Sequence, residues 1–242
     1  MNIFEMTFDQ RLECLRSLVK AAKDEILLVV TFHETWKPTV YDESLLQRMG
    51  NSYATHTFLI IRSALRREVL LGLMRLWDNN RQALSMAKIV EILKDRSFFD
   101  ALVAQRAAHF SRDFDAAAMM REALLPKRDN VLELVRRYLK DGGGSTVLER
   151  LKTLRNQHLA HRQVSEGQAE ATAQAADAAD SEIEVFYADT IELVTALLSL
   201  VFGEAFDIGT DTAGLYQHHG KFFWAAVRGE RTEGHPNYRP SM

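Results

Sequence analysis

Cysteine is almost absent from this chain of 242 residues: Cys14 is the only one, so no disulfide can form within the chain. A protein without disulfides suits a reducing compartment, and we expect it in the cytoplasm. The first ten residues, Met1–Gln10, lack the basic and then apolar pattern of a signal peptide. The longest apolar runs, Ile26–Phe32 and Leu193–Phe202, are too short to span a bilayer, so no membrane is an expected partner.

Proline and glycine are also scarce, with 4 and 12 residues, which argues against a β-sandwich and against a disordered chain. The sequence has no alternating strand pattern of useful length and no repeat of fixed period. The net charge of −3 is close to neutral, so the total charge does not indicate a nucleic-acid-binding protein, although a local basic patch would be hidden in that sum. The hydrophobic fraction of 47% is sufficient for a core.

Apolar residues recur at intervals of three and four over most of the chain, which is the spacing of amphipathic helices. This spacing predicts helices over residues 7–31, 44–77, 85–93, 97–122, 129–140, 146–162 and 182–202. Residues 33–41 are expected to form a connection, and the helix over 97–122 is expected to end before Pro126. The segment Phe58–Trp77 is apolar on most sides, so we expect it to be central. His33 and His109 stand alone in the sequence and are predicted to lie at the surface.

The predicted fold class is therefore all-α, a helical bundle with long antiparallel helices. We expect the bundle to occupy residues 1–203, and residues 204–242 to form a C-terminal appendage with one short helix and a loose tail. Residues 165–180 contain no large apolar side chain and cannot bury a face, so they are predicted to be an exposed helix or a linker. Thr146 and Glu149 have the spacing of a capping box at the start of the helix over 146–162.

The most informative stretch is Leu154–Arg162, with the sequence LRNQHLAHR, at the end of that helix. Because a helix advances about 100° per residue, the apolar stripe of Val147, Leu148, Leu151 and Leu154 continues into a stripe of ionisable residues. The residues of that second stripe are Arg155, His158, His161 and Arg162. Burial of unpaired charge costs several kcal/mol. We therefore expect this face to contact a partner chain, an anion or a reacting group.

Arg155-Asn156 followed by Ala160-His161, on the penultimate long helix of an all-α chain, resembles the HEPN superfamily. Together with MRLWD at Met74–Asp78, the stretch looks most like the AbiU-type abortive-infection branch. The resemblance implies metal-independent cleavage of RNA by a homodimer, in which the motif helices of two copies form a composite site. It also implies a role in phage defence or in a toxin–antitoxin pair, whose antitoxin would be a separate protein, often a nucleotidyltransferase-like one.

By this resemblance, His161 is the general base for the ribose 2′-hydroxyl, Arg155 holds the phosphate, and Asn156 orients one of these groups. The products would be a 2′,3′-cyclic phosphate and a 5′-hydroxyl. Arg155 and His161 differ by about 120° around a regular helix and about 9 Å along it, so they would not touch within one helix. Either the helix bends near His161, or Arg155 of one copy serves with His161 of the other. His158 is an alternative base, and Arg162 is a supporting residue.

Other candidates are weaker. Arg75 and Asp78 are three apart at a helix end and form either an intrahelical ion pair, which we favour, or a brace for the motif helix. Arg62, Arg66 and Arg67 form a basic cluster that is either a solvated face or a holder of RNA phosphate. His218-His219-Gly220 has no accompanying ligand spacing, so no metal and no cofactor are expected. Two further functions stay open: a non-catalytic HEPN module that binds nucleotide or RNA or dimerises, and a plain helical scaffold with a polar dimer seam.

Overall fold

A computed structural model describes residues 5–78, 85–110, 115–155, 169–234 and 238, with the backbone alone for residues 154–155 and 169–179. The regular elements in these ranges are all helical, so the predicted all-α fold class is confirmed. The elements are α1 (Phe8–Trp36), α2 (Pro38–Tyr41), α3 (Glu43–Met49), α4 (Tyr53–Leu76), α5 (Met86–Lys94), α6 (Arg96–Ala107), α7 (Ala116–Tyr138), α8 (Ser145–Arg155), α9 (Ala169–Phe202) and α10 (Ala213–Ala226). A π-helical turn (Ile208–Thr212) precedes α10, and a 3-10 turn (Gly229–Arg231) follows it.

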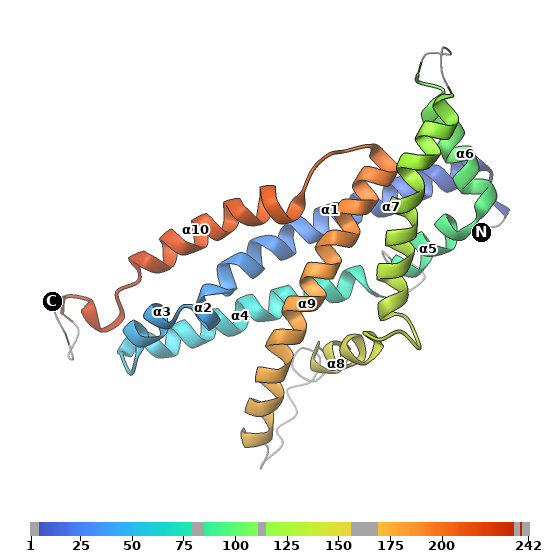
Figure 1. Ribbon diagram of the computed structural model, residues 1–242. Coiled ribbons are helices and arrows are strands. Elements are labelled where there is room, and N and C mark those ends of the chain that lie inside the picture. Colours follow the sequence, from blue (N-terminus) through green and yellow to red (C-terminus); the bar gives the residue numbers. More distant parts are fainter. Residues whose placement is uncertain (1–4, 79–84, 111–114, 156–168, 235–237, 239–242) are drawn as a thin grey trace.

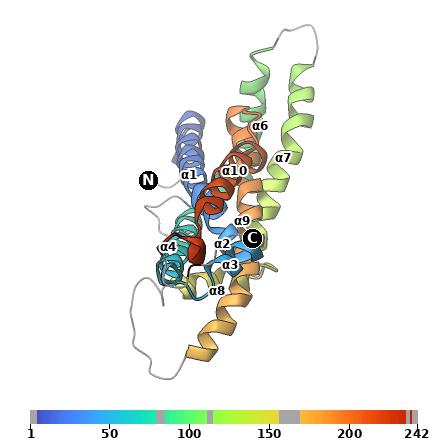
Figure 2. The same ribbon diagram turned by 90° about the vertical axis from the view of Figure 1, so that its left-hand side faces the viewer.

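The bundle is built from two antiparallel pairs of long helices that cross each other. Figure 1 shows α1 and α4 running side by side in opposite directions, with α10 along the other side of α1. The second pair, α7 and α9, crosses the first, and α9 also packs on α1. Figure 2 gives the same arrangement from the end and shows α8 beneath α4. The prediction of long antiparallel helices is thus confirmed.

One large hydrophobic core joins these helices, and a small cluster closes one end. The core takes its buried residues from most of the helices, with α9 contributing a continuous series from Ile183 to Val201. The small cluster, Leu45, Met49, Phe58 and Trp224, fixes the far end of α10 against α3 and α4. The indole Nε1 of Trp224 donates to the carbonyl of Thr35 at 2.7 Å, which ties α10 to α1.

The sequence of α1 explains its length. Thr7 and Gln10 form a reciprocal capping box that satisfies the first backbone N–H groups. A buried stripe then follows at three- and four-residue spacing, and the helix continues through Trp36 rather than stopping near residue 31. The prediction of a connection over residues 33–41 was therefore wrong, because His33 and Trp36 extend the buried stripe and α2 begins at Pro38, a residue suited to a first helical turn.

Two other helix boundaries differ from the prediction. The helix expected over residues 44–77 is divided into α3 and α4 at Gly50, whose φ of 42° is a conformation that glycine adopts without strain. The helix expected to end before Pro126 instead ends at Ala107, and Pro126 lies inside α7. Because proline in a helix interior costs about 3 kcal/mol, we infer that the packing of α7 on α6 and α9 outweighs this cost.

The segment Phe58–Trp77 is central only in part. Residues Val69–Trp77 are largely buried, as expected, but Leu59, Ile60 and Ile61 near the start of α4 are 47%, 55% and 39% exposed. The expected capping box of Thr146 and Glu149 also differs, because α8 begins one residue earlier at Ser145 and Glu149 pairs with Lys152 instead.

Helix α9 is the most apolar element of the bundle. Its segment Asp180–Phe202 has the length and the hydropathy to cross a membrane, but half of that segment is buried among the other helices. Its carboxylates also form ion pairs with neighbouring helices. We interpret α9 as the core helix of the bundle.

His33 is fully buried, so its predicted place at the surface was wrong, whereas His109 is exposed as predicted. Its Nδ1 lies 2.8 Å from Oε1 of Glu34, and its Nε2 lies 2.8 Å from Oε1 of Glu184 on α9. The ring stacks on Tyr187 with a centroid separation of 3.6 Å. Because carboxylate oxygens only accept hydrogen bonds, both ring nitrogens donate, and the imidazole is held as the cation. Burial lowers the pKa of His33, but the hydrogen bonds and charges of Glu184 and Glu34 outweigh it, and the pKa is raised from its ordinary value.

We expect the stability of the protein to fall as the pH rises through this raised pKa. A histidine whose folded pKa is raised stabilises the fold fully below its unfolded pKa of about 6.5, and this contribution is lost when the folded imidazolium deprotonates. Urea unfolding between pH 6 and pH 9 should show the decline in the wild type and a weaker one in His33→Gln, which should be less stable at pH 6 by about 2–4 kcal/mol. The exposed variant His109→Gln is the control, and equal pH dependence in all three proteins would contradict the assignment.

Candidate functional site

The helix that carries the motif residue Arg155 begins at a tight glycine turn. The turn follows the end of α7 at Tyr138, and the backbone N–H of Gly144 donates back to the carbonyl of Arg137 at 2.8 Å. The hydroxyl of Ser145, the first residue of α8, donates to the carbonyl of Gly142 at 2.7 Å. These bonds fix the direction in which α8 leaves α7.

Two of the three glycines in this turn are required by close contacts. A Cβ atom at Gly142 would lie 2.3 Å from the carbonyl oxygens of Arg136 and Arg137, and one at Gly144 would lie 2.6 Å from the ring of Tyr138. A Cβ atom at Gly143 would meet nothing within 4 Å. Gly142 and Gly144 therefore set the distance between the start of α8 and the end of α7, and Gly143 does not.

The rest of α8 is held by one apolar face and by an ion pair to α9. Leu148 is 5% exposed and Leu151 is fully buried, which confirms the apolar stripe predicted for this helix. Arg150 forms an ion pair with Glu182 of α9, and Lys152 pairs with Glu149 along α8 at 2.7 Å. α8 is thus anchored to α4, α7 and α9.

An aromatic cluster lies next to the start of α8. Trp77, from the end of α4, contacts Tyr138 of α7 edge-on at 5.2 Å and Phe186 of α9 at 5.3 Å between ring centroids. The indole Nε1 of Trp77 donates to the hydroxyl of Thr190 at 3.2 Å. Tyr138 donates its hydroxyl to Asp189 of α9, and burial together with this bond raises the pKa of Tyr138 far above its ordinary value. This cluster joins the three helices that support α8.

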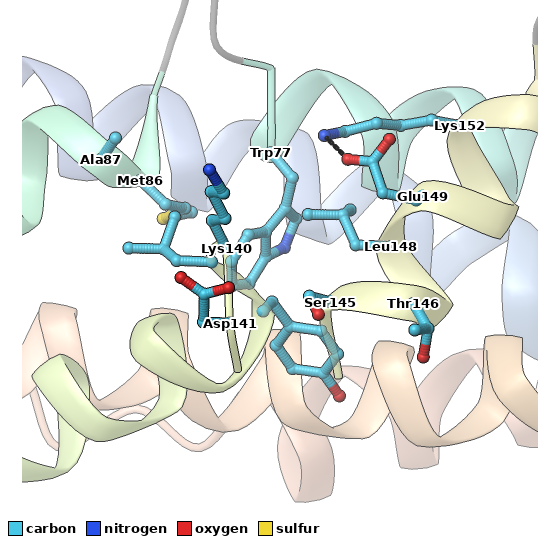
Figure 3. Close-up of a pocket in the computed structure, with 12 residues that line it drawn as sticks. Trp77, Met86, Ala87, Lys140, Asp141, Ser145, Thr146, Leu148, Glu149 and Lys152 are labelled. Carbon is cyan, nitrogen blue, oxygen red and sulfur yellow. Dashed lines mark hydrogen bonds and ion pairs between the residues drawn. The ribbon is translucent and has the colours of Figure 1, made fainter. Parts of the chain in front are cut away.

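A pocket of about 510 Å³ lies between this cluster and the first turns of α8. Figure 3 shows Trp77 and Leu148 on its apolar side, with the ion pair of Glu149 and Lys152 at one edge. Lys140 and Asp141, from the turn after α7, lie at another edge. The described residues of the lining include two lysines and two carboxylates and no histidine.

The structure places the predicted site residues unequally. Arg155 is the last residue of α8, one helical turn beyond Leu151, with its backbone alone described. The four other motif residues, Asn156, His158, His161 and Arg162, lie outside the described residues.

The two residues of MRLWD that were singled out, Arg75 and Asp78, end α4 beside the same region. Arg75 donates to Glu25 of α1 at 2.9 Å, so its ion pair joins α4 to α1. Asp78 is the last described residue before the gap at 79–84.

Sequence reasoning missed Trp77 and His33. Trp77 lies between Arg75 and Asp78, the two charged residues considered in MRLWD. A large aromatic ring directly after an apolar run indicates a core position, and this pattern would have identified Trp77. His33 continues the stripe of Ile26, Val29 and Val30 at helical spacing, and that spacing would have placed it in the core.

Alanine substitution within the glycine turn tests how α8 is positioned. We expect Gly142→Ala and Gly144→Ala to destabilise the protein by about 1–3 kcal/mol, because the added methyl group meets backbone or ring atoms. Gly143→Ala is the matched control and should change stability by less than about 0.5 kcal/mol or increase it slightly. Thermal and urea unfolding of the three variants gives the comparison, and a loss at Gly143 equal to that at Gly142 would show that the turn is not fixed by these contacts.

Comparison with known proteins identifies the family of this chain. A search of curated proteins and a search of solved structures each give no match. A family model described as AbiU2, of the HEPN type, matches residues 7–220, which includes α1, the anchored helix α8, the motif and most of α10. A match over that share of the sequence shows the family, and the protein belongs to the AbiU2 family of HEPN proteins associated with abortive infection.

Proposed function

We propose that the protein is a metal-independent endoribonuclease of a phage-defence or toxin–antitoxin system in the cytoplasm. The observation that carries the proposal is that Arg155 ends the described part of α8, with Asn156 and His161 following it in the sequence, in a chain of the AbiU2 family. The way in which α8 is held supports the proposal, since catalytic groups need a rigid supporting element. α8 is held by the glycine turn, by its buried face and by its ion pair to α9.

The proposed reaction uses groups that these side chains supply. His161 takes the proton of the ribose 2′-hydroxyl, a step for which histidine is the side chain most often used, and the 2′-oxygen attacks the adjacent phosphorus. The bond from phosphorus to the 5′-oxygen breaks, and that oxygen takes up a proton. Arg155 stabilises the charge on the phosphorane oxygens through its planar pair of donors. The products are a 2′,3′-cyclic phosphate and a 5′-hydroxyl.

Substitution of the motif residues tests this proposal. We expect His161→Ala to lower the rate of RNA cleavage in EDTA by roughly 10²- to 10⁴-fold, because it removes the general base, and Arg155→Ala to lower it by a similar factor. His158→Ala decides between the two candidate bases, and Lys152→Ala, on the same helix but outside the motif, should retain activity. Tight binding of RNA with no cleavage by the wild type would instead favour a non-catalytic module.

We also propose that the protein acts as a homodimer, and one face of α4 supports this. Seven exposed residues of α4 at helical spacing form what we call the α4 face: Tyr53, His56, Thr57, Ile60, Ser63, Ala64 and Arg67. Ile60 at its centre is 55% exposed and Tyr53 is 74% exposed, so a second copy would cover apolar surface at both residues.

The α4 face is self-complementary about Ile60. When two copies of α4 cross antiparallel with a two-fold axis at Ile60, residues at equal distances on either side of it meet. The aromatic ring of Tyr53 then meets the cation of Arg67. The large side chain of His56 meets the small side chain of Ala64. α8, the helix that carries Arg155, also contacts α4, the helix that carries this face.

A charged residue at the centre of the α4 face should separate the copies. We expect the wild type to be a dimer in light scattering and Ile60→Asp to be a folded monomer with RNA cleavage reduced at least tenfold, because the composite site needs both copies. Leu28→Asp on α1 is the matched control, since Leu28 is a similarly exposed aliphatic residue at 45%. A monomeric wild type, or a dimer that persists in Ile60→Asp, would contradict the interface.

A further inference from the structure

A second pocket, of about 570 Å³, lies between the end of α1 with α2 on one side and α10 on the other. The polar and aromatic residues of its lining are Glu34, Lys37, Tyr41 and Asp42 on the first side and Gln217, His218 and Lys221 on α10. The carboxylate of Asp42 already accepts from the hydroxyl of Ser44 and the backbone N–H of Leu45. Figure 1 shows α10 along α1 in this region, away from α8. The close approach depends on Gly220, where a Cβ atom would lie 2.8 Å from the carbonyl oxygen of Glu34. The volume is in the range of small-molecule sites, roughly 300–1,000 Å³.

Glu34 supplies an acceptor in this pocket. The residue is only 5% exposed, and its Oε1 accepts from Nδ1 of His33 at 2.8 Å and from the hydroxyl of Tyr187 at 3.1 Å. Its second oxygen, Oε2, has no hydrogen-bonding partner among the described residues. The carboxylate is thus held in place by two donors, and its remaining oxygen is able to accept a hydrogen bond from a ligand. Oε2 is not among the fully buried polar atoms, so a ligand in the pocket can reach it.

The α10 side of the pocket supplies cations. His218 and Lys221 are three residues apart and therefore share a face of α10, and both are exposed. Neither has a hydrogen bond or an ion pair with the described residues. Lys37 stands on the opposite side, 3.5 Å from Glu184. Two lysines and a histidine around one opening are suited to a phosphate group.

Tyr41 adds a planar surface at the rim. Its ring is half exposed and is held at its other side by an edge contact with Trp36, with 6.5 Å between ring centroids. An exposed ring that is fixed from behind offers a stacking surface to a flat ligand. Gly214 also belongs to the lining, and a Cβ atom there would meet nothing within 4 Å, so this side of the pocket is open.

We propose that this pocket binds a small phosphorylated ligand that presents an N–H donor. The N–H group would donate to Oε2 of Glu34, and the phosphate would bind Lys221, His218 and Lys37. Two kinds of molecule share this chemistry: nucleotides whose base carries an amino group, and phosphorylated aliphatic amines. Stacking on Tyr41 distinguishes them, because only the first kind has a planar ring. The site is separate from the motif at the end of α8 and does not depend on its activity.

Titration calorimetry with the full chain tests the proposal, with adenosine monophosphate and O-phosphoethanolamine as probes and inorganic phosphate and adenosine as partial probes. We expect one of the two complete probes to bind saturably and at least tenfold more tightly than either partial probe. Lys221→Ala and Gly214→Trp should each weaken that binding at least tenfold, the first by removing a cation and the second by filling the pocket. Glu34→Gln should reduce the preference for the complete probe over inorganic phosphate.

Two controls locate the binding. His219→Ala removes the neighbouring histidine, which does not line the pocket, and should leave the affinity unchanged. His161→Ala should also leave it unchanged, which separates this site from the motif. No saturable binding of either complete probe, binding equal to that of inorganic phosphate alone, or binding unaffected by both Gly214→Trp and Lys221→Ala would overturn the proposal. Lys221→Ala alters an exposed side chain without partners, so the test does not depend on a destabilised variant.

Discussion

The carboxylates of α9 hold the other helices of this protein in register. Over the thirteen residues from Asp180 to Glu192, α9 presents five polar contacts to four different helices. They are Asp180 with Arg66 of α4, Glu182 with Arg150 of α8, Glu184 with His33 of α1, Asp189 with Arg137 of α7, and Glu192 with Asn130 of α7. The apolar side chains between them supply the burial, which is non-directional, whereas the polar contacts are directional and need particular partners. Together they specify which helix lies against which turn of α9.

The motif helix depends on this arrangement. α8 has only 11 residues, too few to be stable as an isolated helix, so it takes its position from its neighbours. The glycine turn determines where α8 starts, and Leu148 and Leu151 face the core. The ion pair between Arg150 and Glu182 holds α8 against α9. The chain that follows Arg155 therefore leaves from a fixed point, and the proposed catalytic groups are within a few residues of that point. The composite site that we propose needs such a fixed starting point, because catalytic groups must be held within about 0.5 Å of their productive geometry.

The sequence predicted the helical class, the family and the main helices, because apolar spacing and short motifs are local signals. It failed where tertiary contacts decide. Pro126 lies inside α7 although proline opposes helix formation, and His33 is buried because two carboxylates, one of them 151 residues away, compensate its charge. The role of Trp77 could not be read from its neighbours either, since its contacts come from α7 and α9. Arg75 was considered against Asp78 nearby in sequence, yet its partner Glu25 is on α1. The roles of the motif residues after Arg155 stay predictions, since these residues lie outside the described part of the chain.

The central claim is that the ribose 2′-hydroxyl is the nucleophile in a reaction that needs no metal. The most direct measurement uses an RNA oligonucleotide and its copy with a single 2′-deoxy nucleotide 5′ to the cleaved bond, each incubated with the full chain in EDTA. The account predicts that the RNA is cut to leave a 2′,3′-cyclic phosphate, identified by mass spectrometry, and that the deoxy copy is intact at that bond. Cleavage of the deoxy copy, or ends with a 5′-phosphate, would contradict the account.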